Sequence, residues 1–136
     1  MSQAPTTLAP AEALRVLARW GITARAEDVR SGSGTANASA VVDAPHGRLM
    51  LRRRNPRYAH EDWVRFDHAL FAHLAADGLP VPRGVDGAVG RSWLRDGDAL
   101  FELFEFIEGA QHAEGDPGEL LSAGRTLAEL HRSASR

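Results

Sequence analysis

The chain has 136 residues, of which 43% are hydrophobic and 25% charged, so it can bury a core and is not wholly disordered. Its formal net charge of −2 provides no global field for nucleic acid or an anionic membrane. It lacks cysteine, and all 16 basic residues are arginines, which excludes disulfides, thiolate chemistry, Schiff bases and the P-loop lysine. No export signal and no apolar run of about 20 residues occurs, which predicts a soluble, cytoplasmic protein that binds neither nucleic acid nor membrane.

The first half of the chain predicts one helix and then an antiparallel meander. Leu8–Trp20 has apolar residues at helical spacing, and Gly21 ends the helix. Three segments with strand character follow, namely Ala24–Arg30, Ala36–Asp43 and Arg48–Arg54. The last two are joined by Ala44–Gly47, a strong hairpin signal.

The second half predicts a helix, two strands and a final helix. Ala59–Ala76 is expected to bury one apolar face, formed by Trp63, Phe66, Leu70, Phe71 and Leu74. One strand is expected within Gly84–Leu94 and another over Ala99–Ile107, which is apolar on both faces and therefore buried on both. The last helix covers Glu119–Ser133, and nothing is expected to pack its end.

The turn between the first two strands is the first candidate site. Its sequence is Gly32-Ser33-Gly34-Thr35-Ala36-Asn37, and such small residues let backbone N–H groups approach phosphate oxygens. The alternative is a hairpin turn without a ligand. It is not a P-loop, because the Gly-Lys-Ser/Thr ending and the strand-to-helix step are missing.

Arg52 and Asp67 are the next candidates. Arg52 and Arg54 share one face of the third strand and Arg53 faces the other way, so a buried guanidinium needs an acidic partner. Asp67 lies beside the apolar face of the following helix and is a candidate partner for Arg52. The alternatives are a solvated strand edge, a nucleic-acid patch and, for Asp67, a surface acid paired with His60, His68 or another arginine.

No metal or hydrolase signature accompanies these residues. No two histidines have the i, i+4 spacing of a helical zinc site, and neither HExxH nor GxSxG occurs.

Five motifs, in this order and spacing, give the chain a family resemblance that covers about Leu8–His131. They are the G-x-G-x-x-N hairpin, Leu49–Arg54, Gly78–Pro82, Phe104–Gly109 and Gly124–His131. Together they resemble the aminoglycoside phosphotransferase/choline kinase-like family, which has a protein-kinase-like fold.

The resemblance implies an α+β fold, the small N-terminal lobe of a kinase. It has a five-stranded antiparallel sheet, a helix between strands 3 and 4, an N-terminal helix, and a C-terminal helix after the hinge. Residues 1–107 would form the nucleotide-binding small lobe, and residues 108–136 the hinge exit and the first helix of a large lobe.

The resemblance also implies roles for single residues. The hairpin residues Gly32, Ser33, Gly34, Thr35 and Asn37 would cover the phosphates of ATP. Arg52 would reach the α- and β-phosphates, and Asp67 would hold Arg52, replacing the usual Lys–Glu pair by a longer cation and a shorter acid. The hinge residues Glu105, Phe106 and Ile107 would lie against the adenine.

The chain departs from the family pattern in one respect. The family's His-Gly-Asp loop and its Mg²⁺ ligands follow the helix that ends in Leu-His, and neither HGD nor HRD occurs here. We therefore expect an ATP-binding lobe of a small-molecule kinase that uses ATP with Mg²⁺, lacks the magnesium ligands, is truncated before the catalytic loop and is inactive alone. The alternative is a non-catalytic interaction module. The apolar stripe of its last helix, Leu120, Leu127 and Leu130, would bind a large kinase lobe or another copy of the chain.

Overall fold

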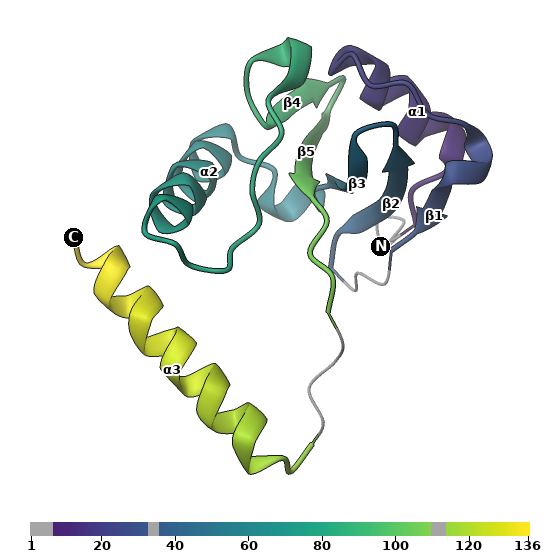
Figure 1. The fold of residues 1–136 in the computed structure, drawn as a ribbon. Coiled ribbons are helices and arrows are strands. Elements are labelled where there is room, and N and C mark those ends of the chain that lie inside the picture. The colour runs from purple at the N-terminus through teal and green to yellow at the C-terminus, as the bar shows by residue number, and fades with distance from the viewer. Residues whose placement is uncertain (1–6, 33–35, 110–113) are drawn as a thin grey trace.

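The structure is a computed structural model that describes residues 7–32, 36–109 and 114–136. The described part contains three α-helices, five strands and three short 3₁₀ turns (Figure 1). The helices and strands are α1 (Pro10–Arg19), β1 (Val29–Ser31), β2 (Ala38–Ala44), β3 (Gly47–Arg53), α2 (Glu61–Ala76), β4 (Trp93–Asp96), β5 (Ala99–Glu105) and α3 (Pro117–Ala134).

The five strands form one antiparallel sheet in the order β1-β2-β3-β5-β4. Helix α2 connects β3 to β4, α1 precedes the sheet and α3 follows it, so the predicted kinase-like small-lobe architecture is confirmed. The β2–β3 hairpin turns at Gly47, whose φ of +141° an L-residue rarely adopts. The expected meander is therefore present.

The two faces of the sheet carry different chemistry because side chains alternate along each strand. On one face, Leu51 of β3 packs with Leu103 of β5 and with Leu17 of α1 in the main hydrophobic core. Arg53 lies on the same face and binds Glu12 of α1, with 2.8 Å between Nη1 and Oε2. The even-numbered residues of β3 and β5 face α2.

The strand β5 lies between β3 and β4 and is buried on both faces. Its residues from Leu100 to Phe104 are each at most 3% exposed, so the predicted burial on both sides is confirmed. This strand ends at Glu105, before the expected Ile107. Strand β1 begins later than expected, because Ala26–Asp28 form a 3₁₀ turn before it. Strand β4 lies at the end of the range expected for it and continues two residues past Leu94, to Asp96, after a 3₁₀ turn at Gly87–Val89.

Helix α2 packs through a face that only partly matches the one its apolar pattern predicts. Val64 and Leu74 are buried, whereas Trp63 is 52% and Phe66 65% exposed, so the prediction that these two aromatics belong to the buried face is wrong. The helix is rotated because it also directs a polar side chain, His68, at the sheet. This rotation leaves an aromatic surface beside the end of β3.

The C-terminal end of α3 lies beside the end of α2 (Figure 1). Ser133 is 1% exposed, and its hydroxyl donates to Asp77 while its carbonyl accepts from His73 Nε2 at 2.8 Å. Arg136 also reaches Asp77 at 2.8 Å. The expectation that nothing packs this helix end is therefore wrong.

Candidate functional site

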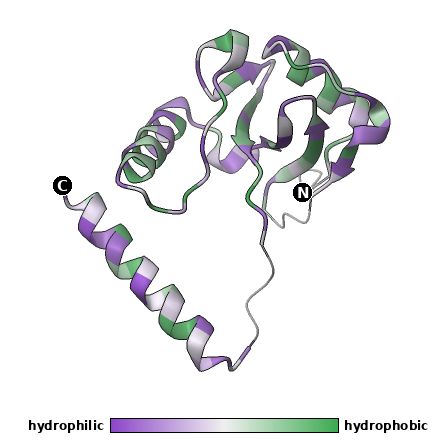
Figure 2. Cartoon of the chain, viewed as in Figure 1, coloured by the Kyte–Doolittle hydropathy of each residue, from purple (hydrophilic) through white to green (hydrophobic). Residues whose placement is uncertain are grey.

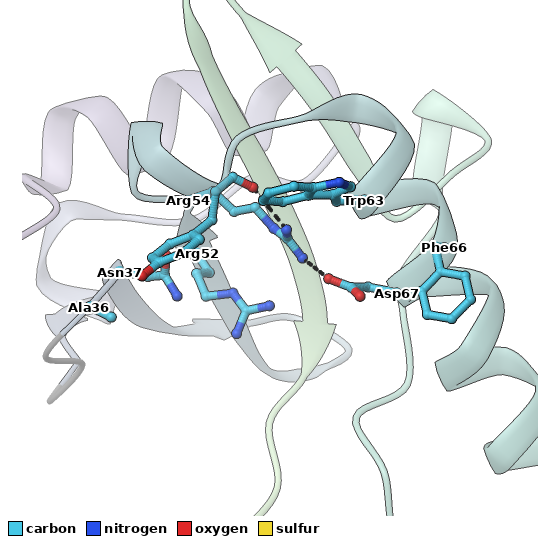
Figure 3. Close-up of a pocket in the computed structure, with 8 residues that line it drawn as sticks. Ala36, Asn37, Arg52, Arg54, Trp63, Phe66 and Asp67 are labelled. Atoms are coloured by element: carbon cyan, nitrogen blue, oxygen red, sulfur yellow. Dashed lines mark hydrogen bonds and ion pairs between the residues drawn. The ribbon is translucent and has the colours of Figure 1, made fainter. Parts of the chain in front are cut away.

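A cavity of about 490 Å³ opens between the end of β3, the start of β2 and α2 (Figure 3). It brings together three of the predicted site residues, Asn37, Arg52 and Asp67. The other lining residues supply a second guanidinium, three aromatic rings and one small side chain. They are Arg54, Tyr58, Trp63, Phe66 and Ala36.

Arg52 is held by a carboxylate of the neighbouring strand β5. It lies directly opposite Glu102 of β5, and opposite residues of an antiparallel pair share a face. Its Nε donates to Glu102 Oε1 at 3.0 Å, and its guanidinium carbon lies 5.3 Å from the centre of the Phe104 ring. Within the described part of the chain, its two terminal nitrogens have no hydrogen-bond partner. The Arg52 side chain is 29% exposed, and these two nitrogens are free charged donors at the cavity.

Asp67 binds Arg54, so the predicted Arg52–Asp67 pair is wrong. Arg54 Nη2 donates to Asp67 Oδ2, and Nη1 donates to the Tyr58 carbonyl at 3.1 Å (Figure 3). Its Nε donates to Glu102 at 2.9 Å. The alternation of β3 places both arginines on the α2 face, but Arg54 lies nearer the point where the chain enters α2. Arg54 therefore pairs with Asp67, the carboxylate of that helix.

Arg54 remains a cation despite being almost fully buried. Burial acts to lower the pKa of Arg54, but hydrogen bonds to Glu102 and Asp67 outweigh it and raise the pKa above the ordinary value. All three of its donor nitrogens are occupied, so Arg54 connects β5, the chain before α2 and α2 itself.

Glu102 is the centre of the polar cluster, and sequence reasoning missed it. Its side chain is 0% exposed, and Oε1 accepts from both arginines while Oε2 lies 2.7 Å from His68 Nε2. Burial acts to raise its pKa, but hydrogen bonds from His68 and Arg52, with the charge of Arg52, lower the pKa to about 2. The available signal was an acid inside the apolar run Leu100–Phe104, since a buried charge requires partners.

His68 connects Glu102 to the loop before β4. Because Glu102 is ionised and can only accept, His68 Nε2 carries the proton that it donates. Its Nδ1 lies 2.6 Å from the Ser92 hydroxyl, and its ring stacks on Phe104 with centroids 5.2 Å apart. The histidine is a structural member of the cluster, fixed on both nitrogens.

The glycine-rich turn is anchored to the end of β3. Gly32 donates to the Ser39 carbonyl at 2.9 Å, and a Cβ at Gly32 would lie 2.0 Å from the Ser39 hydroxyl, so any larger residue would force Ser39 to shift. Asn37 Oδ1 accepts from the Asn55 backbone N–H at 2.8 Å, and Asn55 Nδ2 donates to the Ala36 carbonyl. The remaining predicted turn residues, Ser33, Gly34 and Thr35, lie outside the described residues.

The hinge residues do not line the Arg52 cavity. Glu105 and Phe106 line a second cavity of about 570 Å³, beside the β2–β3 hairpin. Their backbone N–H groups donate to the carbonyls of Arg83 and Arg48, at 2.8 and 3.0 Å. Ile107, 53% exposed, is the first hinge residue whose N–H has no partner among the described residues.

The fold and the charged cluster define the small lobe of a kinase-like protein: a five-stranded sheet, one helix after β3, and a cation on β3 at a cavity. Residues 29–136 match the sequence model of the phosphotransferase enzyme family. The match covers most of the chain, which therefore belongs to this family, as the motifs predicted. No curated protein matches the sequence.

The described residues contain no group of three or more His, Asp or Glu side chains able to hold a metal ion. None of their helices combines the length and the apolar character needed to cross a bilayer.

Proposed function

We propose that this chain is the ATP-binding lobe of a small-molecule kinase and that Arg52 binds the phosphates of ATP. The observation that carries the proposal is the state of Arg52: one nitrogen is used on Glu102, and the other two are free, within the described residues, at a cavity. A planar guanidinium with two free terminal nitrogens matches the geometry of a phosphate group.

The cluster of Arg52, Arg54, Glu102 and Asp67 is neutral overall, and the pairing of its two acids supports a phosphate ligand. Asp67 is the only carboxylate among the residues that line the cavity, and Arg54 neutralises it. An incoming phosphate therefore meets the free end of Arg52 without an unpaired acid beside it. Asn37, tied to the end of β3, brings the glycine-rich turn to the same cavity.

The adenine is assigned to the hinge. We propose that the Ile107 N–H donates to the base, because the two preceding N–H groups are already used inside the lobe. Bound ATP, with Mg²⁺, would supply the phosphoryl group. Arg52 would orient its phosphates, and the hinge its base.

Phosphate transfer needs groups that these residues do not provide. The sequence has no His-Gly-Asp loop, and the described residues hold no acidic cluster for Mg²⁺. We therefore expect these 136 residues to bind Mg·ATP without transferring its phosphate.

A second function, as an interaction module, is favoured by α3. Leu120, Leu121 and Leu127 are each more than half exposed, and Figure 2 shows hydrophobic segments recurring along this helix. An exposed apolar stripe of this kind is typical of an interface. Its proposed partner is a large kinase lobe or another copy of the chain.

Tryptophan fluorescence tests ATP binding directly. Trp63 lines the cavity, whereas Trp20 and Trp93 are at most 5% exposed, so a bound nucleotide is expected to change mainly the Trp63 emission. Arg52→Gln should weaken Mg·ATP binding by about tenfold or more, the worth of a hydrogen bond to a charged group. Arg25→Gln is the matched control, since Arg25 is 80% exposed and does not line the cavity.

Two results would refute the proposal. One is the absence of a saturable response at millimolar Mg·ATP in protein shown to be folded. The other is equal ATP affinity in the Arg52 and Arg25 variants.

A further inference from the structure

We infer that Glu102 of β5, and not Asp67 of α2, positions the Arg52 guanidinium at the cavity. Asp67 has a separate role, which is to hold α2 to the sheet through Arg54. The inference rests on the proposed function in one respect, because it takes ATP as the ligand of Arg52. The contact between Glu102 and Arg52 can be tested without any ligand.

The contacts of the two carboxylates are different. Glu102 bonds Arg52 through Nε, the nitrogen nearest the chain, and this leaves both terminal nitrogens directed to the cavity. Asp67 bonds only Arg54 among the described residues. A carboxylate that binds Nε fixes the plane of the guanidinium without occupying the nitrogens that would meet a ligand.

The surroundings of the two carboxylates also differ. The Glu102 side chain is fully buried, whereas that of Asp67 is 37% exposed. Electrostatic attraction is screened less in the interior, so Glu102 is the stronger anchor. Phe104 supports the other side of Arg52, which confines the guanidinium between a ring and a carboxylate.

Glu102 is itself prevented from turning away. His68 binds Oε2, and Ser92 binds the other nitrogen of His68. Ser92 is confined in turn by Gly84, where a Cβ would lie only 2.4 Å from the serine hydroxyl. A continuous line of hydrogen bonds therefore runs from Ser92 through His68 and Glu102 to Arg52.

The sheet and the helix therefore bind different arginines: Glu102 of β5 bonds Arg52, and Asp67 of α2 bonds Arg54. Helix α2 contacts the cluster through Asp67 and His68, but neither side chain bonds Arg52. Arg52 is thus held by a residue of the sheet, Glu102, and not by a residue of α2. Loss of the Arg54–Asp67 contact should loosen α2 without releasing Arg52.

The first test needs no nucleotide. In ¹⁵N NMR spectra, the Nε–H signals of Arg52 and Arg54 should be protected from solvent exchange, because both bond Glu102. Asp67→Asn should alter the Arg54 signal and leave that of Arg52 in place, whereas Glu102→Gln should alter both. A variant of Asp67 that displaces the Arg52 signal, while Glu102→Gln does not, would overturn the inference.

The second test uses Mg·ATP affinity. Glu102→Gln should weaken binding by about tenfold, and Asp67→Asn by less than about twofold. In an Arg52→Gln background, Glu102→Gln should cause no further loss if Glu102 acts through Arg52. A further loss of similar size in that background would mean that Glu102 acts through the fold alone, and would overturn the inference.

Arg52→Lys covers the case in which Glu102→Gln does not fold. A lysine keeps the charge but lacks Nε and the planar fork, so Glu102 can no longer fix the plane of a guanidinium while two other nitrogens face a phosphate. The Mg·ATP affinity of Arg52→Lys should fall below that of the wild type and stay above that of Arg52→Gln, and wild-type affinity would contradict the inference. If the wild type fails to bind ATP, the proposed function fails, while the NMR signals still decide which carboxylate holds Arg52.

Discussion

Acidification should destabilise this protein through one buried carboxylate, Glu102. Burial alone would raise its pKa, but the hydrogen bonds from His68 and Arg52 lower it from the ordinary 4.5 to about 2. Because the pKa is lower in the folded chain than in the unfolded one, the unfolded chain binds the proton first as the pH falls. The stabilisation is therefore complete above the ordinary pKa and is lost between 4.5 and about 2.

The size of the effect follows from the two pKa values. Each tenfold difference in proton affinity is worth about 1.4 kcal/mol, so the ionised Glu102 contributes about 3 kcal/mol to folding. About 2 kcal/mol of this is lost on acidification to about pH 3. That is a large fraction of the free energy of unfolding of a typical domain.

Two measurements check this prediction. The ¹³C signal of the Glu102 carboxyl should remain that of a carboxylate down to about pH 3 in the folded protein. Urea unfolding of the wild type and of Glu102→Gln, compared at about pH 6 and about pH 3, should give a smaller pH dependence in the variant. An ordinary titration of this carboxyl near 4.5, or the same pH dependence in both proteins, would refute the reasoning.

Two further predictions concern parts of the structure outside the charged cluster. Gly32→Ala should destabilise the protein by about 1–3 kcal/mol in urea unfolding, because its Cβ would overlap the Ser39 hydroxyl. An unchanged unfolding midpoint would contradict the observed closeness of these two residues. Asp77→Asn should speed amide hydrogen exchange in the last turn of α3, because Asp77 accepts from both Ser133 and Arg136. Unchanged exchange there would mean that this helix end is not held by Asp77.

The elements of the fold could largely be predicted because they depend on local patterns. Alternating residues in β2 and β3 and the hairpin signal between them predicted the meander. Strand β5 is buried on both faces, as the apolar residues on both of its faces indicated. Element ends were less predictable. Ala26–Asp28 has no sequence signal that separates a 3₁₀ turn from the start of a strand.

The rotation of α2 about its axis was not predicted by the sequence pattern either. Its apolar pattern favoured burial of Trp63 and Phe66, but the helix instead directs Asp67 and His68 at the arginines and Glu102. The paired charges inside the cluster compete with apolar burial for the face that meets the sheet. A periodicity argument weighs only hydrophobicity, and so it wrongly assigns Trp63 and Phe66 to the buried face.

By itself, the sequence predicted that Arg52 and Arg54 share a face of the third strand, that a guanidinium buried there would need an acidic partner, and that the motifs resemble a phosphotransferase family, which the family match confirmed. Only the tertiary structure decided the pairing. Glu102 is 50 residues from Arg52 in the chain and becomes its neighbour through the β3–β5 register, while Asp67 reaches Arg54 instead. Side-chain alternation is a local property of a strand, whereas the partner of a charge depends on which distant segment the sheet places opposite it.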